Sequence, residues 1–135
     1  MTTILIIEDD TNLIDLYETK FRLEKYEVLT ASDGEAGVAK AVESKPDVIM
    51  LDILMPHVNG FEVLKQLKDH KETKDIPVLV YTNLGSSDSD EKRELAFSLG
   101  AADYLVKALH EPESIVERVN QLVQNQKSAE AVDKK

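Results

Sequence analysis

Short apolar runs alternate with amphipathic stretches along the whole chain. Val48–Leu51 leads directly into Asp52 and turn residues come next, and similar runs stand at Ile4–Ile7 and Val78–Tyr81. A continuous apolar run of this length, bounded by turn residues, is typical of a strand buried on both faces. The pattern predicts strands over residues 3–8, 27–31, 47–52, 78–81 and 102–106.

Between these runs, apolar residues recur at helical spacing. Leu13, Tyr17 and Phe21 share one face, which predicts a helix over about 11–25 with Asp10 or Thr11 as its cap. Four further helices are predicted. The first follows Asp33 and ends at Lys45-Pro46, and the second covers about 59–69. The third follows Asp88 and ends at Gly100, and the fourth includes Ile115–Val123. Helices therefore alternate with strands from one end of the chain to the other.

This alternation predicts an α/β fold, a doubly wound five-stranded parallel sheet of (βα)5 type with helices on both faces. We expect one domain over residues 1–126, since 135 residues suffice for one core and no linker or repeat divides them. Beyond about Asn125 the apolar pattern dissolves, so residues 127–135 are expected to form a polar, disordered tail.

Charge and composition disfavour several classes of protein. The net charge of −10 argues against direct contact with nucleic acid or an anionic membrane, because phosphate binding needs clustered Lys and Arg. The absence of cysteine excludes disulfides, thiolate zinc sites and a cysteine nucleophile. No apolar run approaches the roughly 20 residues of a membrane span and no basic region precedes the first strand, so we expect a cytoplasmic protein.

Polar residues with possible chemistry stand after four of the predicted strands, at the point where each ends. They are Glu8-Asp9, Asp52, Thr82 and Lys107. Each alone has a structural explanation, because chains turn polar where strands surface and Asp52 could simply end its strand and cap the next segment. In a parallel sheet, however, all of these ends lie at one edge, which is where such sheets place ligand chemistry.

Three carboxylates and one ammonium at that edge would sum to a charge of −2. Such a cluster either takes up protons or recruits a cation, and Mg²⁺ suits a site with few protein ligands and several waters. Beside Mg²⁺, Asp52 would be a nucleophile toward a phosphoryl group, and Thr82 and Lys107 would donate hydrogen bonds to the phosphoryl oxygens.

The sequence resembles the receiver domain of bacterial two-component response regulators over about residues 3–125. The motifs that carry the resemblance are Glu8-Asp9, Asp52 with Pro56 and Gly60, Thr82, and Lys107, which are specific as a set. The resemblance implies a flavodoxin-like strand order of 2-1-3-4-5. It also implies that Asp52 accepts a phosphoryl group from a histidine kinase or phosphotransfer protein, and that the domain turns over no substrate other than its own phosphoryl group.

The resemblance further implies roles for individual residues. Mg²⁺, or alternatively Mn²⁺, would be bound by Asp9, Asp52 and the backbone carbonyl of Leu54, with Glu8 acting through water. Thr82, Lys107 and Asn83 would surround the phosphoryl group.

A switch is implied as well. Tyr104 would follow Thr82 inward on phosphorylation; the alternative is a half-buried tyrosine on a strand with no role in switching. The movement would alter the face formed by the fourth helix, fifth strand and fifth helix, where a downstream protein would bind. The chain would be a monomer or a phosphorylation-dependent dimer.

Two positions depart from the family pattern. Ala108 follows Lys107 where the family usually has proline and a cis peptide bond, and a cis bond to a non-proline residue costs roughly 2.5–4 kcal/mol. Asn83 stands where the family prefers a small residue. In addition, Leu54 and Leu84 offer no hydrogen bond to an attacking water, which predicts slow loss of the phosphoryl group.

Two other functions are compatible with an acidic edge. A Mg²⁺-dependent phosphatase of the haloacid dehalogenase type usually carries a second acid two residues after the nucleophile, and that position is Leu54. A receiver-like domain that only binds partners typically lacks one of the acids or the lysine, and none is missing here. The phosphoacceptor hypothesis therefore accounts best for the sequence.

Overall fold

A five-stranded parallel sheet forms the centre of the computed structural model, which describes residues 1–55, 58–82 and 89–133. The strands are β1 (Thr3–Ile7), β2 (Glu27–Ala31), β3 (Val48–Asp52), β6 (Val78–Thr82) and β7 (Asp103–Val106). Their order is β2-β1-β3-β6-β7. The predicted sheet and the strand order implied by the resemblance are both confirmed, with β6 and β7 as the fourth and fifth predicted strands.

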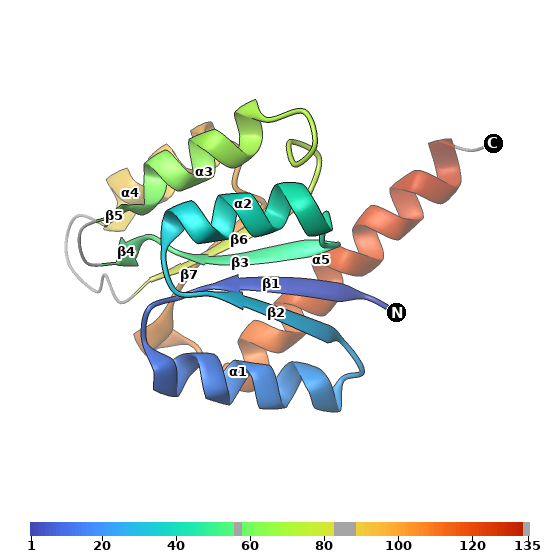
Figure 1. Cartoon of the computed structure of the whole chain (residues 1–135), viewed down its shortest axis with the longest axis horizontal. Helices are drawn as coiled ribbons and strands as arrows, with labels where there is room; N and C mark the ends of the chain where they lie inside the picture. The colour runs from blue at the N-terminus through green and yellow to red at the C-terminus, as the bar shows by residue number, and fades with distance from the viewer. Residues whose placement is uncertain (56–57, 83–88, 134–135) are drawn as a thin grey trace.

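Helices cover both faces of the sheet. They are α1 (Thr11–Leu23), α2 (Gly34–Ser44), α3 (Gly60–Asp69), α4 (Ser89–Ser98) and α5 (Pro112–Asp133). Figure 1 shows α1 and α5 on one face and α2, α3 and α4 on the other. Within the described ranges, no helix combines the length and the apolar character needed to cross a membrane.

The first strand illustrates why an uninterrupted apolar run needs both layers of helices. Leu5 and Ile7 pack into a core cluster that includes residues of α2 and α3, whereas Ile4 and Ile6 pack into the cluster that includes residues of α1 and α5. All four side chains are fully buried. Successive residues of a strand point to opposite faces, so alternate apolar positions serve the two clusters.

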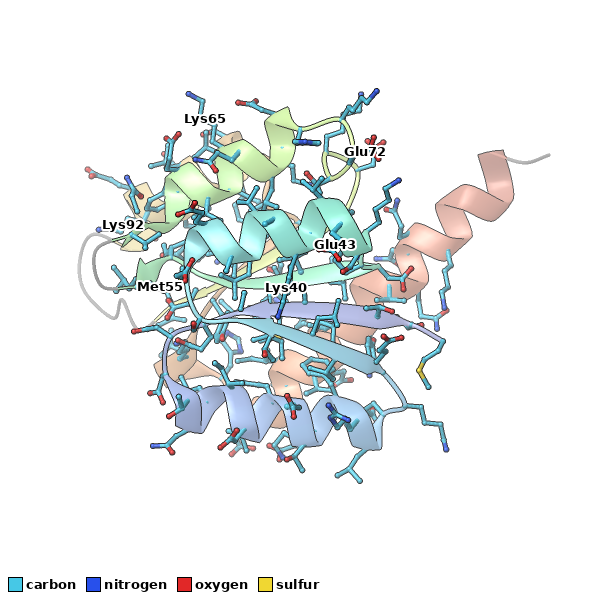
Figure 2. The ribbon with its side chains drawn as sticks, viewed as in Figure 1. Lys40, Glu43, Met55, Lys65, Glu72 and Lys92 are labelled. Carbon is cyan, nitrogen blue, oxygen red and sulfur yellow. The ribbon has the colours of Figure 1, made fainter. Side chains whose placement is uncertain are left out.

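The edge strand β2 is covered by a side chain of α2. Lys40 reaches from α2 toward β2 in Figure 2, and its ammonium donates a hydrogen bond to the backbone carbonyl of Thr30. An open sheet edge is a template for pairing with another chain, and a charged side chain laid across it opposes such pairing.

Several element boundaries differ from the predicted ones. Helix α1 ends at Leu23 instead of residue 25, because the chain reverses through Lys25, whose φ is 68°. Helix α5 continues to Asp133, past the expected end of regular structure near Asn125. The Gln, Lys, Ala and Glu residues after Asn125 favour a helix even without an apolar face. The division of the chain at residue 126 stays a prediction.

The sequence pattern also missed three short elements. Strands β4 (Leu54–Met55) and β5 (Val58–Asn59) form a small antiparallel hairpin directly after β3, and the 3-10 turn η1 (Lys107–Leu109) follows β7. Segments of two or three residues are too short for any apolar period to show. The hairpin matters because it leads the chain away from Asp52.

Candidate functional site

The residues predicted to converge do lie at one edge of the sheet. Asp52 is the last residue of β3, Thr82 is the last of β6, and Glu8 and Lys107 directly follow β1 and β7. The sheet register pairs Asp52 with Tyr81 on the neighbouring strand. Figure 1 shows the ends of these strands on the same side of the molecule, beside β4 and β5.

Glu8 is a buried carboxylate with a donor for each of its lone pairs. Its Oε2 accepts hydrogen bonds from the backbone N–H of Asp9 at 3.0 Å and of Asp10 at 3.1 Å. Its Oε1 accepts from the hydroxyl of Tyr81 at 2.9 Å and from the ammonium of Lys107 at 2.8 Å. Burial alone would raise the pKa of Glu8, but the bonds from Lys107 and Asp10 outweigh it and lower that pKa. Glu8 is therefore fixed as an anion.

Asp52 is held from two sides. Its Oδ1 accepts from the backbone N–H of Leu54 at 2.9 Å, and its Oδ2 lies 3.2 Å from the ammonium of Lys107. Only 3% of the residue is exposed. Burial raises the pKa of Asp52 to about 7; the negative charge of Glu8 adds to the rise, and the Leu54 N–H and Lys107 oppose it. Asp52 is thus a carboxyl group that a nearby cation would readily ionise.

The chain after Asp52 has to turn back tightly, and Gly60 permits it. The backbone N–H of Gly60 donates to the carbonyl of Ile53 at 3.3 Å. A Cβ atom at position 60 would lie 2.2 Å from Cα of Ile53, a backbone atom that cannot move aside cheaply. Glycine at this position therefore lets α3 begin directly against the residue that comes after Asp52.

The acidic residues form a group with the donor chemistry of a divalent cation site. Carboxylate oxygens of Glu8, Asp9 and Asp52 all lie within 4.8 Å of one another. Asp9 stands at the open side of the group, and burial together with the neighbouring Glu8 raises its pKa. Oxygen ligands with an excess of negative charge are what Mg²⁺ prefers in proteins, so the residues present fit such an ion.

Some of the remaining predicted site residues lie in the described part of the chain, and others lie outside it. Thr82 is fully buried, and the bond between Lys107 and Ala108 is trans, since the described residues contain no cis peptide. The side chain of Leu54 is 46% exposed beside Asp52. Asn83, Leu84 and Pro56 lie outside the described residues, so their predicted roles stay predictions.

Tyr104 lies inside the protein. It is 1% exposed and belongs to the core cluster between the sheet and α2–α4. Its backbone carbonyl accepts from Arg93 at 3.1 Å, and the guanidinium lies 6.0 Å from the ring centroid. Within the described part of the chain, its hydroxyl has no hydrogen-bond partner. The structure thus holds the ring in the inward position, and the expected movement between two positions stays a prediction.

Sequence reasoning missed Tyr81 as a site residue. It lies inside an apolar run and is fully buried, as the run predicts, but its hydroxyl reaches Glu8. The available signal in the sequence was a tyrosine directly before Thr82. A buried tyrosine hydroxyl usually has a hydrogen-bond partner, and the acidic edge supplies the acceptor here.

Comparisons with known proteins point to one family. A sequence profile of the response regulator receiver domain matches residues 4–120. The chain is 41% identical over 123 residues to the DNA-binding dual master transcriptional regulator RpaA of Synechocystis sp., covering 91% of this chain and 49% of RpaA. It is 38% identical over 122 residues to Protein PilH of Pseudomonas aeruginosa, covering 89% of this chain and 96% of PilH.

A solved structure gives the same result. The chemotaxis protein CheY4 of Vibrio cholerae matches with a TM-score of 0.81 at 30% identity, covering 90% of this chain and 98% of CheY4. The chain spans about half the length of RpaA and of the Bacillus subtilis regulator PhoP. The similarity to these longer proteins therefore concerns one part of each.

Proposed function

The chain belongs to the response regulator receiver domain family, and from that premise we propose that Asp52 is its phosphoacceptor. The observation that supports the proposal best is the position of Asp52, whose carboxylate lies 3.2 Å from the Lys107 ammonium and within a group of three acids. The phosphodonor is the phosphohistidine of a histidine kinase or of a phosphotransfer protein.

The transfer is a single displacement at phosphorus. An oxygen of Asp52 forms the new P–O bond while the P–N bond of the phosphohistidine breaks. The histidine nitrogen keeps the electron pair and then takes up a proton. Phosphoryl transfer demands little covalent help from the protein, so positioning and charge neutralisation supply most of the rate.

The chain's own residues are suited to both tasks. The backbone N–H of Leu54 and the ammonium of Lys107 hold the Asp52 carboxylate in place from two sides. In the proposal, Lys107 and Thr82, at the ends of neighbouring strands, would donate hydrogen bonds to oxygens of the bound phosphoryl group. The Ala108 peptide being trans does not prevent the ammonium of Lys107 from reaching Asp52.

Mg²⁺ would complete the site in this proposal. Asp9, Asp52 and the backbone carbonyl of Leu54 would hold it, and Mn²⁺ would fit the same ligands. When bound, the ion would supply positive charge that offsets the charge of the carboxylates and of the phosphoryl group. Glu8 would act through water, because an ion bound directly to Glu8 would have to displace one of the four donors that its oxygens already have.

The output of the domain is a change of surface, by this account. On α4, the helix that makes this face with β7 and α5, Phe97 is 40% exposed and its ring lies 5.3 Å from the guanidinium of Arg93. Arg93 links this helix to Tyr104 of β7. A phosphoryl group near Thr82 would shift both elements together, and a protein target that contacts them would respond. Amide spectra with and without beryllofluoride should then differ across residues 82–107, and changes limited to the surroundings of Asp52 would contradict a switch.

A phosphatase acting on a separate substrate is less well supported. Such enzymes usually place an acid two residues after the nucleophile, and Leu54 stands there. We therefore infer a signalling module that carries out only its own phosphorylation and dephosphorylation. RpaA is named as a DNA-binding regulator, but the chain covers half of it, and the negative charge of the domain favours a protein target.

A phosphotransfer screen tests the proposal. Candidate histidine kinases are labelled with radioactive ATP and mixed with the wild-type chain, and loss of label from the kinase is followed with time. We expect rapid transfer from at least one kinase to the wild type and none to Asp52→Asn. Transfer to Asp52→Asn at the wild-type rate would place the phosphoacceptor elsewhere.

A further inference from the structure

Tyr81 joins the apolar core to the acidic edge through three contacts. Its ring is buried between α1 and the sheet, where it meets the Tyr17 ring edge-on at a centroid distance of 5.9 Å. Its hydroxyl donates to Oε1 of Glu8 at 2.9 Å. The ammonium of Lys107 lies over its face, 4.5 Å from the ring centroid. One side chain therefore contacts both members of the Glu8–Lys107 ion pair.

We propose that Tyr81 is a positioning residue for phosphoryl transfer, which lets Lys107 leave Glu8 for the phosphoryl group on Asp52. The proposal rests on the phosphoacceptor function of Asp52 inferred above. Its physical basis is the sharing of one ammonium between two buried carboxylates.

Lys107 is divided between the two acids in this structure. It lies 2.8 Å from Glu8 and 3.2 Å from Asp52, so its shorter contact is with the residue that accepts no phosphoryl group. Donating to a phosphoryl oxygen requires the ammonium to move toward Asp52 and to loosen its bond to Oε1 of Glu8. A buried carboxylate oxygen left without a donor carries a large desolvation penalty.

The Tyr81 hydroxyl removes that penalty. It donates to the same oxygen, Oε1, that Lys107 would release, while Oε2 keeps its two backbone donors. The ring face meanwhile offers the ammonium a favourable surface along which to move, as cations are attracted to aromatic faces within about 6 Å. Phenylalanine would fill the same space and keep that surface but would lose the second donor to Glu8.

The test compares Tyr81→Phe with Tyr17→Phe, which removes a hydroxyl from the neighbouring buried ring. Phosphorylation by acetyl phosphate is measured against donor concentration at saturating Mg²⁺, together with the Mg²⁺ dissociation constant from amide spectra. We expect Tyr81→Phe to lower the maximal rate about tenfold, the scale of one charge-assisted hydrogen bond, with the half-saturating donor concentration unchanged. Tyr17→Phe should stay within about twofold of wild type, and Mg²⁺ affinity should be unchanged in both.

A double-substitution cycle shows whether Tyr81 acts through Glu8. In a Glu8→Gln background the further change Tyr81→Phe should alter the rate less than about twofold, because the buried charge is already gone. A maximal rate for Tyr81→Phe equal to that of Tyr17→Phe would overturn the proposal, as would the same loss in both backgrounds. Failure of the wild type itself to accept phosphoryl would instead contradict the proposed function.

A second measurement needs no substitution. In protein with ¹³C-labelled tyrosine rings, exchange of the Tyr81 hydroxyl proton is followed with and without beryllofluoride. The proposal predicts slow exchange in both states, since the bond to Glu8 persists when Lys107 moves. Fast exchange with the mimic bound would show that Tyr81 releases Glu8 as well, and would overturn the proposal even if Tyr81→Phe did not fold.

Discussion

Oδ2 of Asp52 and the ammonium of Lys107 lie 3.2 Å apart, with 5% and 10% of the two side chains exposed. Asp52 ends β3 and Lys107 follows β7, so the two residues meet across the end of β6 although 55 positions separate them in the chain. The buried ammonium of Lys107 holds the Asp52 carboxylate in place. When a phosphoryl group binds to Asp52, the same ammonium also has to donate to the phosphoryl oxygens. Stability and phosphoryl transfer therefore depend on the same ion pair.

The first prediction concerns the loss of that cation. Lys107→Met leaves the carboxylates of Glu8 and Asp52 buried without their shared partner, so the free energy of unfolding should fall by about 3 kcal/mol at pH 8 without Mg²⁺. The loss should be smaller at pH 5, where Asp52 takes up a proton. Urea denaturation at the two pH values measures both.

The control for this variant is Lys20→Met. Lys20 pairs with Glu113 at 2.6 Å on the surface, where solvent screens the pair. Its replacement should leave the denaturation midpoint nearly unchanged. Equal effects of the two substitutions would mean that the buried pair at the sheet edge contributes no more than a surface pair.

The second prediction rests on the raised pKa of Asp52. Its folded-state pKa is about 7 and its ordinary value is 3.8, so the folded protein binds this proton more tightly than the unfolded chain. The contribution of Asp52 to stability is therefore greatest below about pH 4 and declines as the pH rises toward 7. Without Mg²⁺, Asp52→Asn should remove this decline, and thermal unfolding between pH 4 and 8 measures it.

Mg²⁺ should reverse this loss of stability with rising pH, because it binds the ionised Asp52 carboxylate of the folded state. Its apparent affinity should rise about tenfold between pH 6 and pH 8 and then level off, and saturating Mg²⁺ should raise the melting temperature. Asp9→Ala should lose that stabilisation. Identical melting temperatures with and without millimolar Mg²⁺ at pH 8 would contradict a metal site at Glu8, Asp9 and Asp52.

A third prediction concerns the turn after Asp52. Gly60→Ala should lower the free energy of unfolding by about 2 kcal/mol or more, because the new Cβ would lie 2.2 Å from the backbone of Ile53. Gly34→Ala is the matched comparison. Its Cβ would meet side-chain methyl groups of Val63 and Val58, at 2.5 and 2.9 Å, which can shift. We therefore expect Gly34→Ala to lower the free energy of unfolding less than Gly60→Ala does. A larger loss for Gly34→Ala in denaturant unfolding would show that the backbone around Ile53 and Gly60 rearranges at little cost.

The fourth prediction concerns the lifetime of the phosphorylated state. Hydrolysis needs a water in line behind phosphorus, and the half-exposed Leu54 beside Asp52 offers that water no hydrogen bond. The phosphorylated protein should last many minutes or longer, and Leu54→Asn with Leu84→Glu should shorten the lifetime by positioning the water. Leu54→Val, which keeps an apolar side chain, should not. A wild-type half-life of seconds, measured after removal of the phosphodonor, would rule out this role for the leucines.

The sheet and most of the site could be predicted because the decisive signals are local. A buried parallel strand is an unbroken apolar run, and the residue that ends it is easy to identify, as at Asp52 and Lys107. The pairing of Glu8 with Tyr81 could not be predicted this way. It depends on a side chain inside an apolar run, where strand alternation gives the face of the sheet but does not show that the hydroxyl reaches Glu8 beyond the ring of Tyr17.

The end of α5 was mispredicted for a different reason. An apolar period reports burial, and the residues after Asn125 have no such period although they favour a helix by propensity alone. The inward Tyr104 was similarly undetermined, since a tyrosine on a strand is compatible with either position. Its ring packs in the core against α4, where the Arg93 guanidinium lies 6.0 Å from the ring centroid.

The most direct test of the whole account is covalent labelling by acetyl phosphate in the presence of Mg²⁺, quantified by intact mass and located by peptide mapping. The wild type should take up one phosphoryl group on Asp52, and Asp52→Asn should take up none. Asp10→Asn is the control: Asp10 caps α1 through the N–H groups of Asn12 and Leu13, and asparagine caps equally well, so labelling should persist. Stoichiometric labelling of Asp52→Asn would contradict the central claim.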